Sequence, residues 1–231
     1  MMSKKTTIRI GSVVLAVVIG WWLYAQHRYD DPDAFARMPV STAGMGNWNE
    51  YHDAHFGFEI KYPQNYFLDQ KYAADTTSAS PTRFLSLRQN TTSEEECRTI
   101  GKRIGVHILR LGRVTGFNLA GCSIKLTENT RVADIEQQFL TEASKDHRPK
   151  VQRTCYRRDI NGNDSIVLTK CAPGEAPGLT GGIFEVYVLG IHETGDGERI
   201  LVRMDNTAGG TPHTGDRALR RDVLRIFHTL R

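Results

Sequence analysis

The stretch Trp48–Tyr66, WNEYHDAHFGFEIKYPQNY, decides the fold of this chain. From Phe56 to Tyr62, aromatic and aliphatic side chains alternate with glycine and charged ones, which is the period of a strand that buries one face and exposes the other. Pro63 has no N–H for a strand ladder and favours an extended conformation at the residue before it. The pattern therefore predicts a first core strand that ends at Tyr62 and turns in the two residues after Pro63.

The rest of the chain contains short alternating segments, turn signals and two amphipathic helices. Expected strands cover 67–73, 83–88, 103–111 and 122–126, with hairpins of 151–160 and 165–171 around Asn161-Gly162-Asn163 and of 183–192 and 199–204 around residues 195–197. Helices with one apolar stripe are expected from a cap at Asn129 or Thr130 to about Pro149, and from about Asp216 to Leu230. Strands joined by hairpins and combined with two such helices predict the α+β class, an antiparallel sheet covered by helices.

The aromatic residues Trp48 and Tyr51, followed by FGFxIxYPxxY, resemble the opening of small exported bacterial domains with a PsbP-like fold, named for the extrinsic photosystem II subunit. The resemblance covers this segment and, more loosely, the C-terminal helix. It implies an antiparallel sheet covered by helices, and it brings no catalytic residues to this sequence.

The basic charge of the chain is concentrated at its N-terminus. The formal net charge is +4, but residues 1–26 carry Lys4, Lys5 and Arg9 and no acid, which leaves 27 basic and 26 acidic side chains in residues 27–231. A nearly neutral domain without clusters of basic and aromatic residues argues against nucleic-acid binding.

An uncharged run of 16 residues, 10–25, follows these basic residues. It reaches the length of a membrane span when Ile8 and its neighbours are included, and Trp21, Trp22 and Tyr24 resemble an interfacial aromatic belt. We expect a signal anchor at residues 8–25 rather than a cleaved signal peptide, although Ala25 leaves cleavage open. The N-terminus is then cytoplasmic and the rest of the chain is extracytoplasmic in a single-pass cell-membrane protein. We therefore expect three parts. Residues 1–25 form the cytoplasmic tip and the anchor, residues 26–47 form a linker, and residues 48–231 form the domain.

Four cysteines, Cys97, Cys122, Cys155 and Cys171, follow the apolar run. Their even number and the extracytoplasmic location favour two disulfides, and none has the CxxC spacing of a zinc knuckle. If a five-residue loop joins the hairpin around Gly162, it brings Cys155 opposite Cys171, and the pair Cys97–Cys122 follows by elimination.

An enzymatic alternative begins at Thr154-Cys155. Sortases are membrane-anchored, extracytoplasmic cysteine transpeptidases with a Thr-Cys at the end of a core strand, a histidine on an earlier segment and an arginine downstream. Here His107 would be the histidine, and either Arg157 or Arg158 would be the arginine. The Cys155 thiol would then form a thioester, and the arginine would stabilise the oxyanion. The residues between Cys155 and the arginines are fewer than the sortase pattern has, and Thr154 lacks its flanking leucine.

Two other groups of residues resemble metal sites. His52 and His55 are three residues apart without a third ligand in the sequence, and 159–165 has oxygen side chains at alternate positions but lacks the Gly and Glu of an EF-hand loop. We therefore expect no metal and no cofactor. No nucleotide-binding or hydrolase motif was found, so we expect no catalytic residue.

The C-terminal helix has a basic stripe opposite its apolar one, formed by Arg217, Arg221 and Arg225. Such a stripe is either a solvated helix face or a contact with an anionic surface, that is, anionic lipid or an acidic protein partner. Taken together, the sequence favours a non-catalytic, membrane-tethered extracytoplasmic domain that binds or scaffolds another component. Its ligand is unknown.

Overall fold

The computed structural model describes residues 15–20, 31–68, 80–89, 103–145, 151–172, 183–206 and 217–231. Residues 15–20 are helical, and within the described ranges no helix has the length and apolar character needed to cross a membrane. The other residues of the anchor expected at 8–25 lie outside the described part of the chain.

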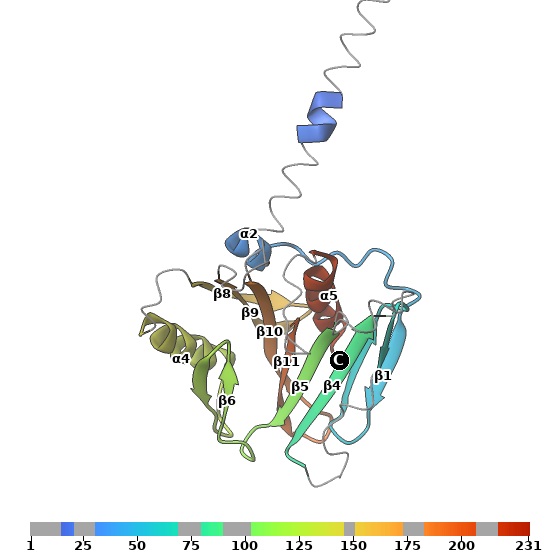
Figure 1. Ribbon diagram of the computed structural model, residues 1–231. Helices are drawn as coiled ribbons and strands as arrows, with labels where there is room; N and C mark the ends of the chain where they lie inside the picture. Colours follow the sequence, from blue (N-terminus) through green and yellow to red (C-terminus); the bar gives the residue numbers. More distant parts are fainter. Residues whose placement is uncertain are drawn as a thin grey trace, which may run out of the picture.

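The central element is an antiparallel sheet (Figure 1), in which the described ranges contribute seven strands in the order β3-β4-β5-β11-β10-β9-β8. Its strands are β3 Tyr66–Leu68, β4 Thr82–Gln89, β5 Arg103–Arg110, β8 Gln152–Ile160, β9 Asn163–Ala172, β10 Ile183–Glu193 and β11 Arg199–Asp205. Separate antiparallel hairpins are formed by β1 Asn49–Asp53 with β2 Phe58–Tyr62, and by β6 Gly116–Leu119 with β7 Cys122–Lys125. The helices are α2 Pro32–Ala36, α4 Val132–Ser144 and α5 Arg217–His228. The expected α+β class is confirmed.

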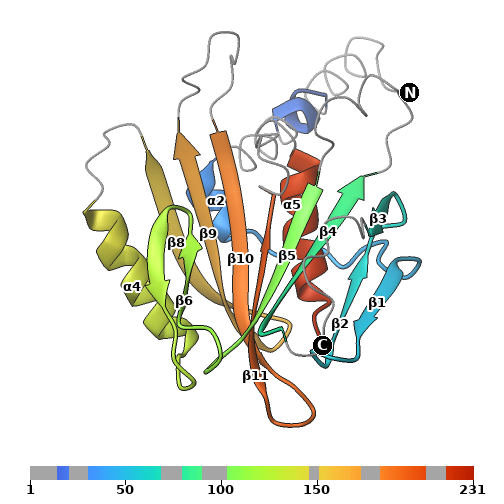
Figure 2. The same cartoon turned by 60° about the horizontal axis from the view of Figure 1, so that its bottom comes forward.

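Each face of the sheet has its own hydrophobic core. Val186 and Val188 of β10 belong to the first face, which is covered by β1–β2, α2 and α5. Tyr187 and Leu189 alternate with them and belong to the second face, which is covered by β6–β7 and α4. Figure 2 shows α4 and the β6–β7 hairpin on the opposite side of the sheet from α5. The helix α5 can approach closely at Gly190, because a Cβ there would lie 3.0 Å from the Phe227 ring.

The stretch that decides the fold forms a core strand that ends at Tyr62, as predicted, although β1 precedes it and makes it the second strand of the domain. Phe58 and Ile60 are buried, and the turn after Pro63 is closed by the Tyr66 amide, which donates to the Pro63 carbonyl at 2.9 Å. However, β2 pairs with β1 and not with the central sheet. On its other side it pairs with the end of the chain: the Glu59 amide donates to Arg231 O at 2.9 Å, and the Lys61 amide donates to the Thr229 hydroxyl at 2.7 Å.

The start of α4 also differs from the prediction. The N-cap is Arg131, whose amide donates to the Asp134 carboxylate at 2.8 Å, while the Thr130 hydroxyl accepts from the Thr127 amide instead. Most of the expected apolar stripe is buried, but Leu140 is 51% exposed.

The residues expected to form a linker are, from 31 to 47, part of the domain. Phe35 in α2 is fully buried against β8 and β9, where its ring lies 5.9 Å from that of Phe184. Arg158 donates to the carbonyls of Ala36 and Met38 at 3.2 and 2.6 Å. The composition of this segment is loop-like, and the one aromatic residue that anchors it gave no periodic signal.

Candidate functional site

A buried carboxylate lies on the second face of the sheet, between an arginine and a histidine. The Oδ2 atom of Asp205 is 3.1 Å from Arg203 Nε and 3.3 Å from His107 Nε2. The Asp205 side chain is fully buried, the Arg203 side chain is 13% exposed, and that of His107 is 32% exposed. His107 and Arg203 are opposite one another on β5 and β11, so the strand register brings the three groups together. A buried charge is tolerated only when it is paired, and Asp205 has both partners.

A second ion pair continues this line of polar residues across the sheet. The Tyr187 hydroxyl donates to Glu185 Oε2 at 2.7 Å, and Lys170 Nζ lies 3.1 and 3.0 Å from the two Glu185 oxygens. Burial, followed by the Glu185 contact, raises the pKa of Tyr187 far above its usual value, so it remains a hydrogen-bond donor. The Arg203 guanidinium lies 5.9 Å from the Tyr187 ring. This contact joins the group around Asp205 to the group around Glu185. We call the set His107, Asp205, Arg203, Tyr187, Glu185 and Lys170 the polar row.

Ser86 lies beside the polar row on β4. It is opposite Gly105 of β5, and Gly105 is in turn opposite Asp205 of β11, so all three are on the second face. Gly105 places no side chain between the other two. Ser86 is 1% exposed, and its hydroxyl has no hydrogen-bond partner among the described residues. Leaving a buried hydroxyl unpaired costs about 1–3 kcal/mol, which marks this position as more than ordinary packing.

Sequence reasoning identified only His107 of the polar row. Four of the other five members stand at alternate positions of two largely apolar strands, in Glu185-x-Tyr187 and Arg203-x-Asp205, and the fifth, Lys170, is on β9. Charged residues facing inward in such strands are a usable signal, but it takes the strand order to show that these two pairs are neighbours.

The sortase-like arrangement is wrong. His107 is on β5 and Cys155 is on β8, with β11, β10 and β9 between them. Arg157 is held by Asp164 at 2.8 and 2.7 Å, and Arg158 binds the backbone of the α2 segment. Burial raises the pKa of the Cys155 thiol to about 12, which is the reverse of what a nucleophile requires.

The disulfide predicted between Cys155 and Cys171 is also wrong. A two-residue turn with positive φ at Asn161 and Gly162 joins β8 to β9, so Cys155 is opposite Leu168 and Cys171 is opposite Gln152. Cys155 packs in the core of the second face and Cys171 in that of the first, and both are free thiols. The five-residue loop assumed from the sequence gave the wrong register. Cys97 lies outside the described residues, so the pairing of Cys97 with Cys122 stays a prediction.

The basic stripe of α5 is only partly exposed to solvent. Arg225 is only 14% exposed, lies 4.7 Å over the Trp48 ring and donates to the carbonyls of Ser41 and Ala43. Arg225 therefore holds the N-terminal segment of its own chain. An anionic-surface contact of the basic stripe stays a prediction. Arg221 is 45% exposed and lies 3.8 Å from Asp222. Arg217 is half-buried.

The two groups that resembled metal sites have other contacts. His55 Nε2 lies 3.1 Å from an Arg110 nitrogen, and the Asp159 carboxylate accepts from the Gly162 amide at 2.9 Å within the hairpin turn. In the described residues no group of three or more His, Cys, Asp or Glu side chains is placed to hold a metal ion.

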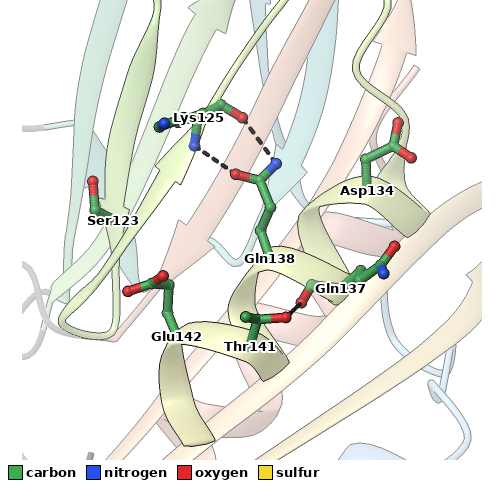
Figure 3. A pocket seen from close by; sticks show the side chains of 7 residues that line it. All are labelled: Ser123, Lys125, Asp134, Gln137, Gln138, Thr141 and Glu142. Carbon is green, nitrogen blue, oxygen red and sulfur yellow. Dashed lines mark hydrogen bonds between the residues drawn. The ribbon is translucent and has the colours of Figure 1, made fainter. Parts of the chain in front are cut away.

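Two cavities flank α4. One of about 420 Å³ lies between α4 and β7 (Figure 3). In it the Gln138 amide spans the edge of β7, accepting from Lys125 N at 2.8 Å and donating to Lys125 O at 3.1 Å. The other, of about 380 Å³, lies at the start of α4 and contains Arg131, Arg157 and Arg199. The first two are paired with carboxylates and Arg199 donates to two carbonyls, so these side chains are already engaged.

Searches against family models and against curated proteins found no match. Among solved structures, the chain is similar to cyanobacterial PsbP from Synechocystis sp. PCC 6803, with 14% identity and a TM-score of 0.42 over 84% of this chain and 98% of that one. It is also similar to a protein from Bacteroides thetaiotaomicron, with 11% identity and a TM-score of 0.39 over 80% of this chain and 48% of that one. Identities and scores this low support no inference about activity, ligand or partner. The motif resemblance at Trp48–Tyr66 stays a prediction.

Proposed function

We propose that this chain is a non-catalytic, membrane-tethered extracytoplasmic domain that binds another protein through the polar row. The tether would be residues 8–25, preceded by basic residues and followed by the acids at 30, 31 and 33. The observation that carries the proposal is the buried Asp205, held between Arg203 and the partly exposed His107.

A stability argument alone does not account for this arrangement. Replacing buried ion pairs by apolar residues is often neutral or stabilising, so such pairs are better explained by the specificity they provide. Here strand pairing fixes the spacing of the charges. The members that a partner can reach are His107 and Lys170, which are 32% and 20% exposed, while Asp205 and Ser86 lie buried beneath them.

The dimensions of the row favour a protein over a small molecule. It extends over the four adjacent strands β5, β11, β10 and β9, a width of about 14 Å at the usual spacing between strands. Its cations, Arg203 and Lys170, and its anions, Asp205 and Glu185, are interspersed, which suits a partner with complementary charges and gives specificity more than affinity. Binding through it should weaken as salt is raised.

A site-specific photocrosslinker tests this proposal. Phe84 is a suitable position, because its ring lies 4.6 Å from that of His107 and is half-buried. Benzophenylalanine replaces Phe84, and the protein is irradiated in cells of the source organism. When the polar row is otherwise wild type, we expect one discrete crosslinked adduct with a partner protein. It should be lost when His107→Gln and Lys170→Gln change the two members of the row that are most exposed to a partner.

The matched control is the pair His52→Gln and Lys61→Gln on β1–β2, where Lys61 is also a half-buried partner of a strand carboxylate. This pair should leave the adduct unchanged. An adduct that survives the changes at His107 and Lys170 would contradict binding through the polar row.

A further inference from the structure

The position at which the N-terminal segment joins the domain restricts how the domain can stand on a membrane. The central sheet has two ends. At one of them, which we call the α2 end, β9 finishes with Cys171 opposite Phe184 of β10, and the ring of Phe35 in α2 packs against Phe184. Asp31, just before α2, is near enough to Cys171 to influence the pKa of its thiol. The other end, which we call the hairpin end, carries the turns at Asn161–Gly162 and at 194–197.

The connection to the expected anchor is short. Because residues 31–47 are packed onto the domain, only Gln26–Asp30 separate it from Ala25. Fully extended, the chain from Ala25 to Asp31 spans at most about 20 Å.

That span is less than the length of the domain. The strand β10 has 11 residues from the α2 end to the hairpin end, which corresponds to roughly 33 Å. A domain attached at its α2 end therefore cannot turn its hairpin end to the bilayer. Figure 1 shows α2 and the β10–β11 hairpin at opposite extremes of the folded part.

The first turns of α5 are at the same end as α2. The Arg220 guanidinium lies 4.2 Å over the Phe184 ring, while Phe227 lies near Gly190, closer to the hairpin end. Arg217 and Arg221 are therefore at the α2 end, and the side chain of Arg221 is 45% exposed. Of the acids in the described residues at this end, Asp33 is paired with Arg37 at 3.3 Å, Asp31 caps α2, and Asp222 lies 3.8 Å from Arg221.

We infer that the α2 end of the domain rests on the lipid headgroups of the membrane, with Arg217 and Arg221 against anionic lipid. The inference rests on the proposed function, because it needs the anchor at residues 8–25. It adds an orientation: the strands stand upright on the membrane, and the polar row, near the α2 end, meets its partner close to the membrane surface.

Energy transfer to the membrane tests this orientation. The full-length chain is reconstituted in vesicles of phosphatidylcholine and phosphatidylglycerol with a headgroup acceptor, and a fluorescent amino acid is placed either at Ala218 or at Gly195. Ala218 is exposed at the α2 end, and Gly195 has no neighbouring atom within 4 Å at the hairpin end. We expect the efficiency of energy transfer to the headgroup acceptor to be higher from position 218 than from position 195. Equal or reversed efficiencies would overturn the orientation.

A lengthened connection tests the role of the arginines. With thirty Gly and Ser residues inserted after Ala25, the connection no longer imposes an orientation. The difference between the two positions should then persist on vesicles with phosphatidylglycerol, and it should disappear on phosphatidylcholine alone or in the Arg217→Gln and Arg221→Gln double variant. The matched control, Arg131→Gln with Arg157→Gln on α4 and β8, removes the same charge and should retain the difference. A difference that disappears on both kinds of vesicle would overturn the headgroup contact.

Flotation separates this inference from the proposal on which it rests. If the full-length chain does not float with vesicles, the anchor is wrong and the proposed function fails. If it floats but the transfer from 218 does not exceed that from 195, the anchor stands and the orientation is wrong.

Discussion

Cys155 illustrates how burial sets the chemistry of a single side chain. Its pKa is raised to about 12 by desolvation, helped by the negative charge of Glu136. At pH 8, a thiol with that pKa is ionised about a thousandfold less than an ordinary thiol of pKa near 8.5. We therefore expect alkylation of Cys155 by iodoacetamide in the folded protein to be slower by about that factor than in urea. Mass spectrometry of the labelled peptide measures it, and equal rates would contradict the burial.

The same shift has a consequence for stability. The folded-state pKa of Cys155 is above the unfolded one, so the neutral thiol contributes fully to stability below about pH 8.5. That contribution is lost as the pH rises toward 12. Between pH 8.5 and pH 10.5, the free energy of unfolding should therefore fall less in a Cys155→Ala variant than in the wild type. Urea denaturation of both proteins at the two pH values measures this difference.

Asp205 and Ser86 should respond to truncation in opposite ways. Asp205→Ala leaves Arg203 buried without its carboxylate, and we expect it to lower the free energy of unfolding by about 3–5 kcal/mol. Ser86→Ala removes a hydroxyl that has no partner among the described residues, so stability should be unchanged or slightly higher. Urea denaturation of a chain beginning at Asp31 compares the two. A large loss in Ser86→Ala would show that its hydroxyl is bonded in solution.

At the scale of elements, the helix α2 is short, but its single buried aromatic residue should matter. Phe35→Ala removes a fully buried ring from the first core and should lower the free energy of unfolding by about 3–5 kcal/mol. Phe67→Ala is the matched control, because Phe67 is 38% exposed and its truncation should cost much less. If both variants are equally stable, residues 31–47 behave as the linker that their composition indicated.

The sequence predicted elements better than their partners. Alternation identified β2, β5 and both long hairpins, and the helical stripes identified α4 and α5, because these signals are local. It did not show that β2 leaves the central sheet, since pairing depends on contacts with Arg231, far along the chain. The register of the β8–β9 hairpin was misjudged by the length of its turn, and the disulfide failed with it.

The candidate site was harder to predict for the same reason. The polar row takes its residues from the consecutive strands β9, β10 and β11 and from β5, which is far away in the sequence and pairs with β11. Only His107 stood out beforehand, in a catalytic role that its neighbours do not support. Its true partners become visible once the strand order is known.

At the scale of the whole molecule, the proposed topology gives a direct expectation. Residues 27–231 should be outside the cytoplasm and attached through residues 8–25. Protease added to intact spheroplasts should digest the domain, and the mature protein should retain Met1 or Met2. A soluble product that begins near Gln26 would contradict the anchor.

The pairing of β2 with residues 229–231 also determines when the fold can be completed. The partners Lys61 and Thr229 are 168 positions apart, so closing this contact requires nearly the whole chain. A polypeptide that emerges from the ribosome or a translocation pore with its N-terminus first has β2 available early but lacks its second neighbour until the last turn of α5 is out. In the meantime one edge of β2 is open to other chains, which makes the interval before release the period of greatest risk of aggregation.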